Sequence, residues 1–67
     1  MSSPAKNQFT IVLTAEERTI LQEILEEELK ETEIEEHRTD MLRAKGILQA
    51  REKTIQSMLQ KIGAGGA

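Results

Sequence analysis

The stretch EILEEELKETEIEEHRTDML, residues 23–42, decides whether this chain forms one long helix or two. It contains neither Gly nor Pro, so no residue within it forces a helix to end. Between Leu25 and Met41, however, the only apolar residues are Leu29 and Ile34. A short helix depends for its stability on burying a continuous apolar face. The stretch is therefore either an exposed part of a long rod or the place where the chain turns back.

The direction of the apolar residues on either side of the stretch separates these alternatives. Before it, Leu21, Ile24 and Leu25 form one helical stripe, and after it a second stripe runs from Met41 to Ile62 in steps of three and four. At 100° per residue, the two stripes point roughly 170° apart on a straight helix. Winding the helix to a period of 3.5 residues still leaves them about 100° apart. A rod would bury one stripe and expose the other.

A turn near residues 37–39 lets both stripes face each other. We therefore predict an all-α fold, an antiparallel two-helix hairpin with helices over about residues 15–37 and 40–62. Thr14 and Glu17 form a capping-box pattern at the first helix, because each side chain can bond the other residue's backbone N–H. Thr39 or Asp40 is expected to cap the second helix, and Gly63 is expected to end it.

The rest of the chain is divided by composition. Residues 1–8, MSSPAKNQ, are predicted to be a disordered arm, and residues 63–67, GAGGA, a flexible tail. Residues 9–13, FTIVL, are rich in β-branched residues, which predicts an extended segment or short strand. Such a strand has no partner in the hairpin of residues 14–62, so it either lies on the helices or pairs with a second subunit.

A chain of 67 residues has a marginal core unless disulfides, a metal or oligomerisation supplements it. Cysteine is absent and His37 is the only histidine, so disulfides and a zinc site are not expected, and oligomerisation is left. We predict a homodimer in which two hairpins form a four-helix bundle with coiled-coil packing. The residues expected at its core and interface are Leu21, Ile24, Leu25, Leu48, Ile55, Met58, Leu59 and Ile62.

Two charged residues interrupt the apolar stripes. Glu28 lies in the middle of the first stripe, and Arg51 takes a core position in the second. With a turn near residue 39 they fall at similar heights, which predicts an ion pair that fixes the register of the two helices more than it adds stability. The alternative is that both side chains reach water from the edge of the seam.

Charge is distributed unevenly along the chain. Residues 1–36 contain ten Glu against three cations, a balance of −7, whereas residues 37–67 contain six cations against two acids, a balance of +4. The two halves are expected to attract each other within or between chains. The longest apolar run, residues 11–13, is far too short for a membrane span, and we expect a cytoplasmic location.

Catalytic patterns are not found. A lone His37 provides no nucleophile–base pair, and no Gly-rich phosphate loop precedes a helix. A di-metal Glu-x-x-His motif would need Glu three residues before His37, where Ile34 stands. We therefore predict a protein that is not an enzyme and holds no cofactor or metal.

The predicted function is protein–protein interaction, as a small adaptor or regulator. Met41 and Met58 suit adaptable packing at a partner surface, and core filling explains them equally well. The alternative is a nucleic-acid-binding regulator that uses the basic second helix or a paired strand at residues 9–13. Against it, Thr10 and Val12, the outward positions of that strand, carry no positive charge, and acids outnumber cations in the chain.

Three segments carry a resemblance: LTAEE followed by paired aliphatics, IEEHRTD, and ILQAREKTIQSMLQKI. Over roughly residues 13–62 they resemble a group of small uncharacterised bacterial helical proteins with an L-T-x-E-E start and a Thr-Asp turn after an acidic stretch. The resemblance implies a helical hairpin and no activity. Glu28 and Thr32 depart from it, because aliphatic residues would be expected there. The architecture is also similar to that of Rop-type hairpins, which dimerise into four-helix bundles, by analogy of fold alone.

Overall fold

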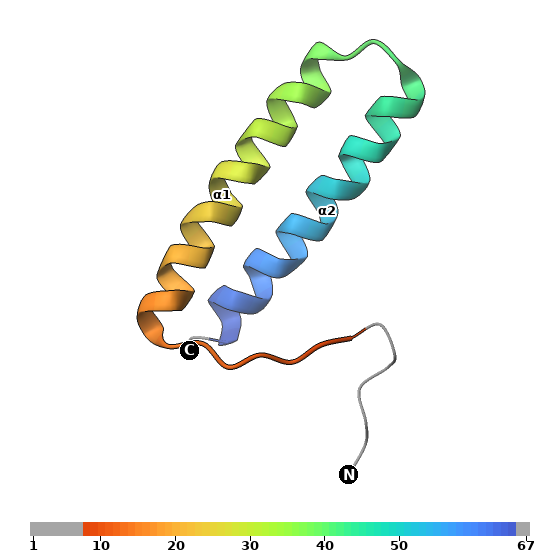
Figure 1. Cartoon of the computed structure of the whole chain (residues 1–67). Coiled ribbons are helices and arrows are strands. Elements are labelled where there is room, and N and C mark those ends of the chain that lie inside the picture. The colour runs from red at the N-terminus through yellow and green to blue at the C-terminus, as the bar shows by residue number, and fades with distance from the viewer. Residues whose placement is uncertain (1–7, 66–67) are drawn as a thin grey trace.

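The computed structural model describes residues 8–65 of the chain. They form two helices, α1 (Ala15–Arg38) and α2 (Leu42–Gly65), which run antiparallel and side by side (Figure 1). Within residues 8–65 no strand is formed. The predicted all-α hairpin is therefore confirmed. The expected arm of residues 1–8 and tail of residues 63–67 lie partly outside the described residues.

The start of α1 is fixed by its capping box. The backbone N–H of Glu17 donates to Thr14 Oγ1 at 3.1 Å, and the N–H of Thr14 donates to Glu17 Oε1 at 2.9 Å. Two donors that the helix itself cannot satisfy are thereby bonded. Glu16 and Glu17 also place negative charge at the positive end of the helix dipole. The predicted cap at Thr14 is present in the structure.

The turn between the helices differs from the prediction. Thr39 ends α1, since its N–H donates to Glu35 O at 3.1 Å and its backbone is extended. α2 begins only at Leu42, after Met41, whose carbonyl accepts from Lys45 N–H at 2.9 Å. The prediction that Thr39 or Asp40 caps α2 is therefore wrong, because the chain needs residues 39–41 to reverse direction. The Thr39 hydroxyl instead accepts from Met41 N–H at 3.4 Å, across the turn.

The end of α2 also differs. The helix was expected to stop at Gly63, but it continues to Gly65. A glycine stop requires a residue of positive φ, and no glycine in the described residues has one. Gly46, in the first half of α2, is exposed, and a Cβ added there meets nothing within 4 Å. Gly46 is thus tolerated at an open position, with no neighbouring helix that demands its small size.

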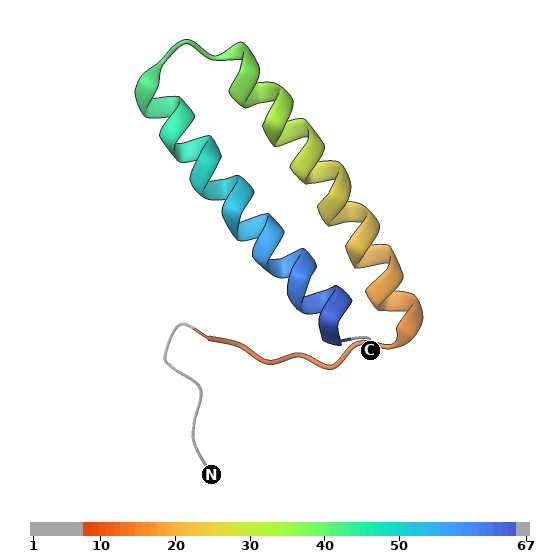
Figure 2. The same ribbon diagram turned by 180° about the vertical axis from the view of Figure 1, so that it is seen from behind.

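Residues 8–14 form an arm without regular structure that leads into α1. Seen from the front and from behind, the arm crosses beneath the end of α2 (Figures 1 and 2). It therefore lies at the open end of the hairpin, opposite the turn. Whether residues 9–13 pair with a second subunit stays a prediction.

Candidate interaction surface

The seam between the helices is built on a spacing of alternating three and four residues. Leu25 and Ile55 are buried, Ile55 with 3% of its surface exposed, and they form the apolar core of the single hairpin. Half-buried aliphatic residues extend this core along both helices: Leu21, Leu29, Leu48, Leu59 and Ile62. Because each helix contributes one narrow row, a single hairpin buries little apolar surface.

Toward the turn, the seam becomes polar. Thr32 is the most deeply buried residue described, at 1% exposure, and its hydroxyl donates to Glu28 O at 2.8 Å. Gln49 Nε2 donates to Glu36 Oε2 at 3.0 Å and joins the two helices. Thr32 satisfies its hydroxyl within its own helix, so it can occupy a position where an aliphatic residue was expected.

Two carboxyl groups meet in this polar part. A hydrogen bond with Glu36 is the main cause that raises the pKa of Glu52, and burial and the charges of Glu36 and Glu33 add to it. The pKa of Glu36 is lowered, first by the same bond and then by the bond from Gln49. Oε2 of Glu52 is buried and has no donor within the described residues. Two carboxyl groups that bond each other in this way favour one proton shared between them.

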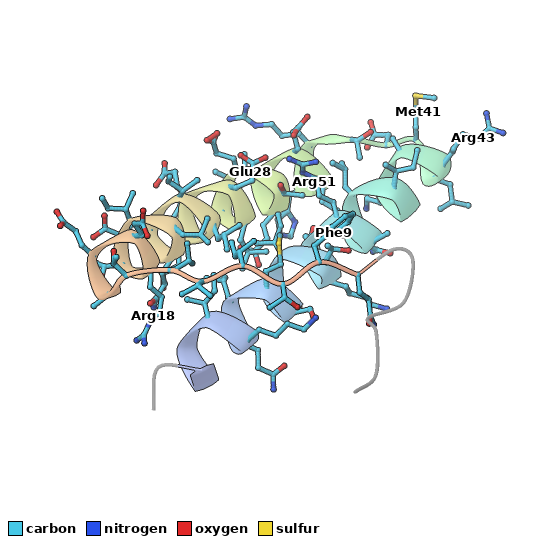
Figure 3. The ribbon with its side chains drawn as sticks, turned by 60° about the horizontal axis from the view of Figure 1, so that its bottom comes forward. Phe9, Arg18, Glu28, Met41, Arg43 and Arg51 are labelled. Carbon is cyan, nitrogen blue, oxygen red and sulfur yellow. The ribbon has the colours of Figure 1, made fainter. Side chains whose placement is uncertain are left out.

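The ion pair predicted between the helices is present. Arg51 Nη2 lies 2.7 Å from Glu28 Oε1, and the two labelled residues lie next to each other in Figure 3. Arg51 is 56% exposed and Glu28 41% exposed, so the pair sits at the edge of the seam. The placement of Arg51 in the core is wrong, because Glu52 takes the position between Leu48 and Ile55. The pair joins α1 and α2 on one side of the hairpin and marks that side.

That side carries three of the exposed apolar residues, Ile24, Ile47 and Met58. At about 100° per residue, Leu21 and Ile24 share a side of α1 with Glu28. Ile47 and Met58 share a side of α2 with Arg51 in the same way. We call this side the apolar face and define it by Leu21, Ile24, Ala44, Ile47, Met58 and Ile62. The opposite side, the polar face, is defined by Gln22, Glu26, Glu33, Gln49, Lys53 and Gln56.

Two residues predicted for the core are therefore exposed in the single hairpin. Ile24 is 57% exposed and Met58 38% exposed, and Ile47, which was not predicted, is 65% exposed. Leu25 and Ile55 are buried as expected, and the other predicted residues are half-buried: Leu21, Leu48, Leu59 and Ile62. An exposed apolar row on one face is typical of a surface that contacts another protein.

At the open end, the arm and the helices enclose a groove of about 690 Å³. Phe9, Ile11 and Leu13 of the arm line it on one side, and Leu21, Met58 and Ile62 on the other. Phe9 lies over this region in Figure 3, yet it is 89% exposed. The groove continues the apolar face, with which it shares three residues.

Sequence reasoning missed the polar part of the seam. Thr32 and Glu36 continue the spacing that begins at Leu25 and Leu29, and Glu52 continues the spacing through Leu48. The heptad spacing alone could have located all three, if polar residues had been accepted at seam positions.

Within residues 8–65, no group of three or more His, Cys, Asp or Glu residues is arranged to hold a metal ion. Neither described helix is long and apolar enough to cross a membrane.

Comparison with known proteins found no matching family model, no matching curated protein and no matching solved structure. The resemblance to small bacterial hairpin proteins thus stays a prediction.

Proposed function

We propose that this chain is a non-enzymatic interaction module, a small adaptor or regulator that acts in the cytoplasm as a homodimer. In the dimer, two hairpins form a four-helix bundle through their exposed apolar residues. The observation that carries this proposal is that few aliphatic side chains are buried while several large ones are exposed. Leu25 and Ile55 are the buried aliphatic residues of the described chain, whereas Ile24 and Ile47 are more than half exposed.

The physical reason is the small size of the hairpin. A domain this short seldom buries enough apolar area to offset the entropy of ordering its backbone. A second hairpin adds a layer of side chains over the first and converts exposed apolar surface into core. Association then stabilises the fold by mass action, so dimer and folded chain form together.

The test is the molecular mass in solution, measured by light scattering over a range of concentrations. The dimer has twice the 7.6 kDa mass of the chain. Dilution to sub-micromolar concentration should lower both the mass and the helical circular dichroism signal. A mass of one chain at all concentrations, together with a melting temperature that does not depend on concentration, would contradict the dimer.

Binding of a further protein rests on the apolar residues outside the apolar face. Met41 and Leu42 at the turn are 67% and 86% exposed, and Ile34 on α1 is also exposed. Replacing Met41 and Leu42 by Ser should abolish co-purification of the native partner and leave the dimer mass unchanged. A matched double replacement of Gln56 and Gln60 by Ser on α2 is the control. Equal partner recovery from both variants would argue against this surface.

Nucleic-acid binding is the second candidate, and the charge of α2 favours it. Helix α2 carries five Lys and Arg against Glu52, a net charge of +4. Of these cations, Arg51 is already paired with Glu28 of α1. A salt-dependent gel shift with random-sequence DNA or RNA would support this candidate, and the dependence should disappear when Lys53 and Lys61 are replaced by Gln.

A further inference from the structure

The two broad faces of the hairpin offer a second copy very different surfaces. The apolar face exposes Ile24, Ile47 and Met58, whereas the polar face consists of amides and charges. Covering the apolar face gains about 25 cal/mol for each Å² removed from water. Covering the polar face would cost free energy at every group left without a partner. A second copy is therefore expected on the apolar face.

The size of this face is sufficient. Each helix has 24 residues and is about 36 Å long at 1.5 Å per residue. Two helices 8–10 Å apart present a face roughly 20 Å wide. Stacking two such faces buries about 1,400 Å² in total, which lies within the range of stable interfaces.

Two hairpins can stack face to face about a twofold axis in two ways. In the first, the axis is parallel to the helices, so α1 lies over the α2 of the partner and each residue keeps its height. In the second, the axis crosses the helices at a right angle, so α1 lies over the α1 of the partner and the heights are reversed. Charge separates these two arrangements.

The helices themselves carry opposite net charges. Helix α1 has ten Glu against three cations, a balance of −7, and α2 has five cations against one Glu, a balance of +4. The first arrangement places each acidic helix between two basic ones. The second places the acidic helices against each other and the basic helices against each other, which costs Coulomb energy along the whole interface.

Individual charges repeat this match on the side of the hairpin that holds the apolar face. The bond between Glu28 and Arg51 sets the height of one helix against the other. Toward the turn, Glu35 lies seven residues beyond Glu28 and Arg43 eight residues before Arg51, heights that agree within about 2 Å. Three acidic residues thus lie at heights that match three basic residues: Glu17, Glu28 and Glu35 on α1, and Lys61, Arg51 and Arg43 on α2.

We propose that the dimer forms through the apolar face about a twofold axis parallel to the helices, with Arg51 between Glu28 of its own chain and the partner subunit's Glu28. The proposal rests on the dimer proposed above and adds its face and its axis. The second arrangement would bring Glu28 within about one helical turn of the partner subunit's Glu28, because both lie near the middle of α1.

One geometric consequence makes the axis measurable. With the axis parallel to the helices, both turns lie at one end of the bundle and both arms at the other. With the crossing axis, each end of the bundle holds one turn and one arm. The chain contains no cysteine, so a single introduced cysteine carries a spin label at one defined place.

The experiment labels Asp40→Cys, in the turn, and Lys53→Cys, near the middle of α2, and measures distances between subunits by pulsed electron resonance. Labels at residue 40 should lie within about 25 Å of each other, given helix spacings of 8–10 Å. The crossing axis would separate these two labels by roughly 36 Å, the length of the helices, or more. Labels at residue 53 report dimer formation in both arrangements.

The outcomes are distinguishable. A distance at residue 53 with a short distance at residue 40 is the expected result. A distance at residue 53 with a long distance at residue 40 overturns the parallel axis and leaves the dimer. No distance between subunits at either position, together with the mass of one chain, overturns the dimer and this inference with it.

A second pair of variants tests the charges independently. Glu28→Arg and Arg51→Glu should each weaken the dimer, and an equal mixture of the two should bind about tenfold more tightly than either alone, because the charges match again across subunits. The control pair, Glu26→Arg and Lys53→Glu, changes the same charges on the polar face. If both mixtures recovered dimer affinity to the same extent, the proposal would be overturned.

Discussion

The two halves of the seam contrast in chemistry. In the half next to the arm, which we call the open half, the seam is aliphatic, with Leu25 and Ile55 at its centre. In the half next to the turn, the closed half, it holds Thr32 and the carboxyl pair of Glu36 and Glu52. The open half stabilises the fold by burying hydrocarbon. The closed half contributes little of that kind, and its hydrogen bonds instead fix which residues face each other.

The aliphatic contacts therefore stabilise the hairpin, whereas the polar contacts fix the register of its helices. An aliphatic seam tolerates sliding of one helix past the other, because many registers bury similar area. A bond such as that from Gln49 to Glu36 is lost when the register changes. The Glu28–Arg51 pair lies between the two halves and also fixes the register of the helices.

The largest expected effect is the loss of the open half. Ile55→Ala removes the most buried aliphatic side chain of the hairpin and should lower the free energy of unfolding by about 2–5 kcal/mol. Chemical denaturation followed by circular dichroism measures this loss. Ile20→Ala, at a position 51% exposed on α1, is the control and should cost much less. Similar losses for both variants would contradict the assignment of the core.

The next effect concerns the buried hydroxyl of the closed half. Thr32→Val should raise the free energy of unfolding by about 1 kcal/mol, because the hydroxyl bonds only a carbonyl of its own helix and its loss leaves no partner unsatisfied. Thr54→Val is the matched control, since Thr54 makes the same bond, to Ala50 O at 3.1 Å, on the exposed surface. A loss of stability at Thr32→Val would show that the hydroxyl has a further role in the seam.

A smaller gain is expected at Gly46, also in the closed half. Gly46→Ala should stabilise the hairpin by up to about 1 kcal/mol, because alanine favours the helix and a Cβ meets nothing within 4 Å. Thermal unfolding measures the gain. Gly63→Ala, equally open but close to the end of α2, is the control and should gain less. A destabilised Gly46→Ala would indicate a close contact with a second copy at that point.

The open half could be predicted from the sequence, because aliphatic spacing and a capping box are local signals. Leu25 and Ile55 followed from their spacing, and Thr14 and Glu17 from the cap pattern. The out-of-phase stripes also identified the turn. The cap and the aliphatic spacing depend on residues within three or four positions of each other, where the rules of helix geometry apply directly.

The closed half could not be predicted in the same way. Glu52, and not Arg51, lies in the seam, because α2 is rotated about its axis by about one residue from the orientation that the apolar stripe alone indicated. The burial of Thr32 depends on a bond to its own helix, which composition does not show. The delayed start of α2 after Met41 depends on how much chain the turn needs. The position of Glu52 and the length of the turn are properties of the assembled hairpin.

The ion pair between the halves should contribute less than the aliphatic residues. A double-mutant cycle with Glu28→Ala and Arg51→Ala should give a coupling of about 0.5 kcal/mol within one chain, because both side chains are about half exposed and water screens them. The control cycle uses Glu27, on the outer side of α1, with Lys53, and should give a coupling near zero. A zero coupling for Glu28 and Arg51 would remove their role in fixing the register.

The smallest expected effect is a change in pH dependence that comes from the carboxyl pair. The raised pKa of Glu52 gives stability that is present in acid and lost as the pH rises through that pKa, because the shared proton leaves. The lowered pKa of Glu36, which His37 and Lys45 also favour, gives stability that is lost as the pH falls.

The pair should therefore stabilise the closed half most strongly in mild acid. Glu52→Gln keeps a hydrogen-bond donor toward Glu36 but does not titrate, so its melting temperature should fall less than that of the wild type as the pH rises from mild acid to neutrality. Glu23→Gln, an exposed change of the same kind on α1, should leave the wild-type difference in place. If Glu52→Gln and Glu23→Gln gave the same pH profile, the two carboxyl groups would not share a proton. Within the described residues, the polar contacts that join the two helices in the closed half would then be limited to the bond between Gln49 and Glu36.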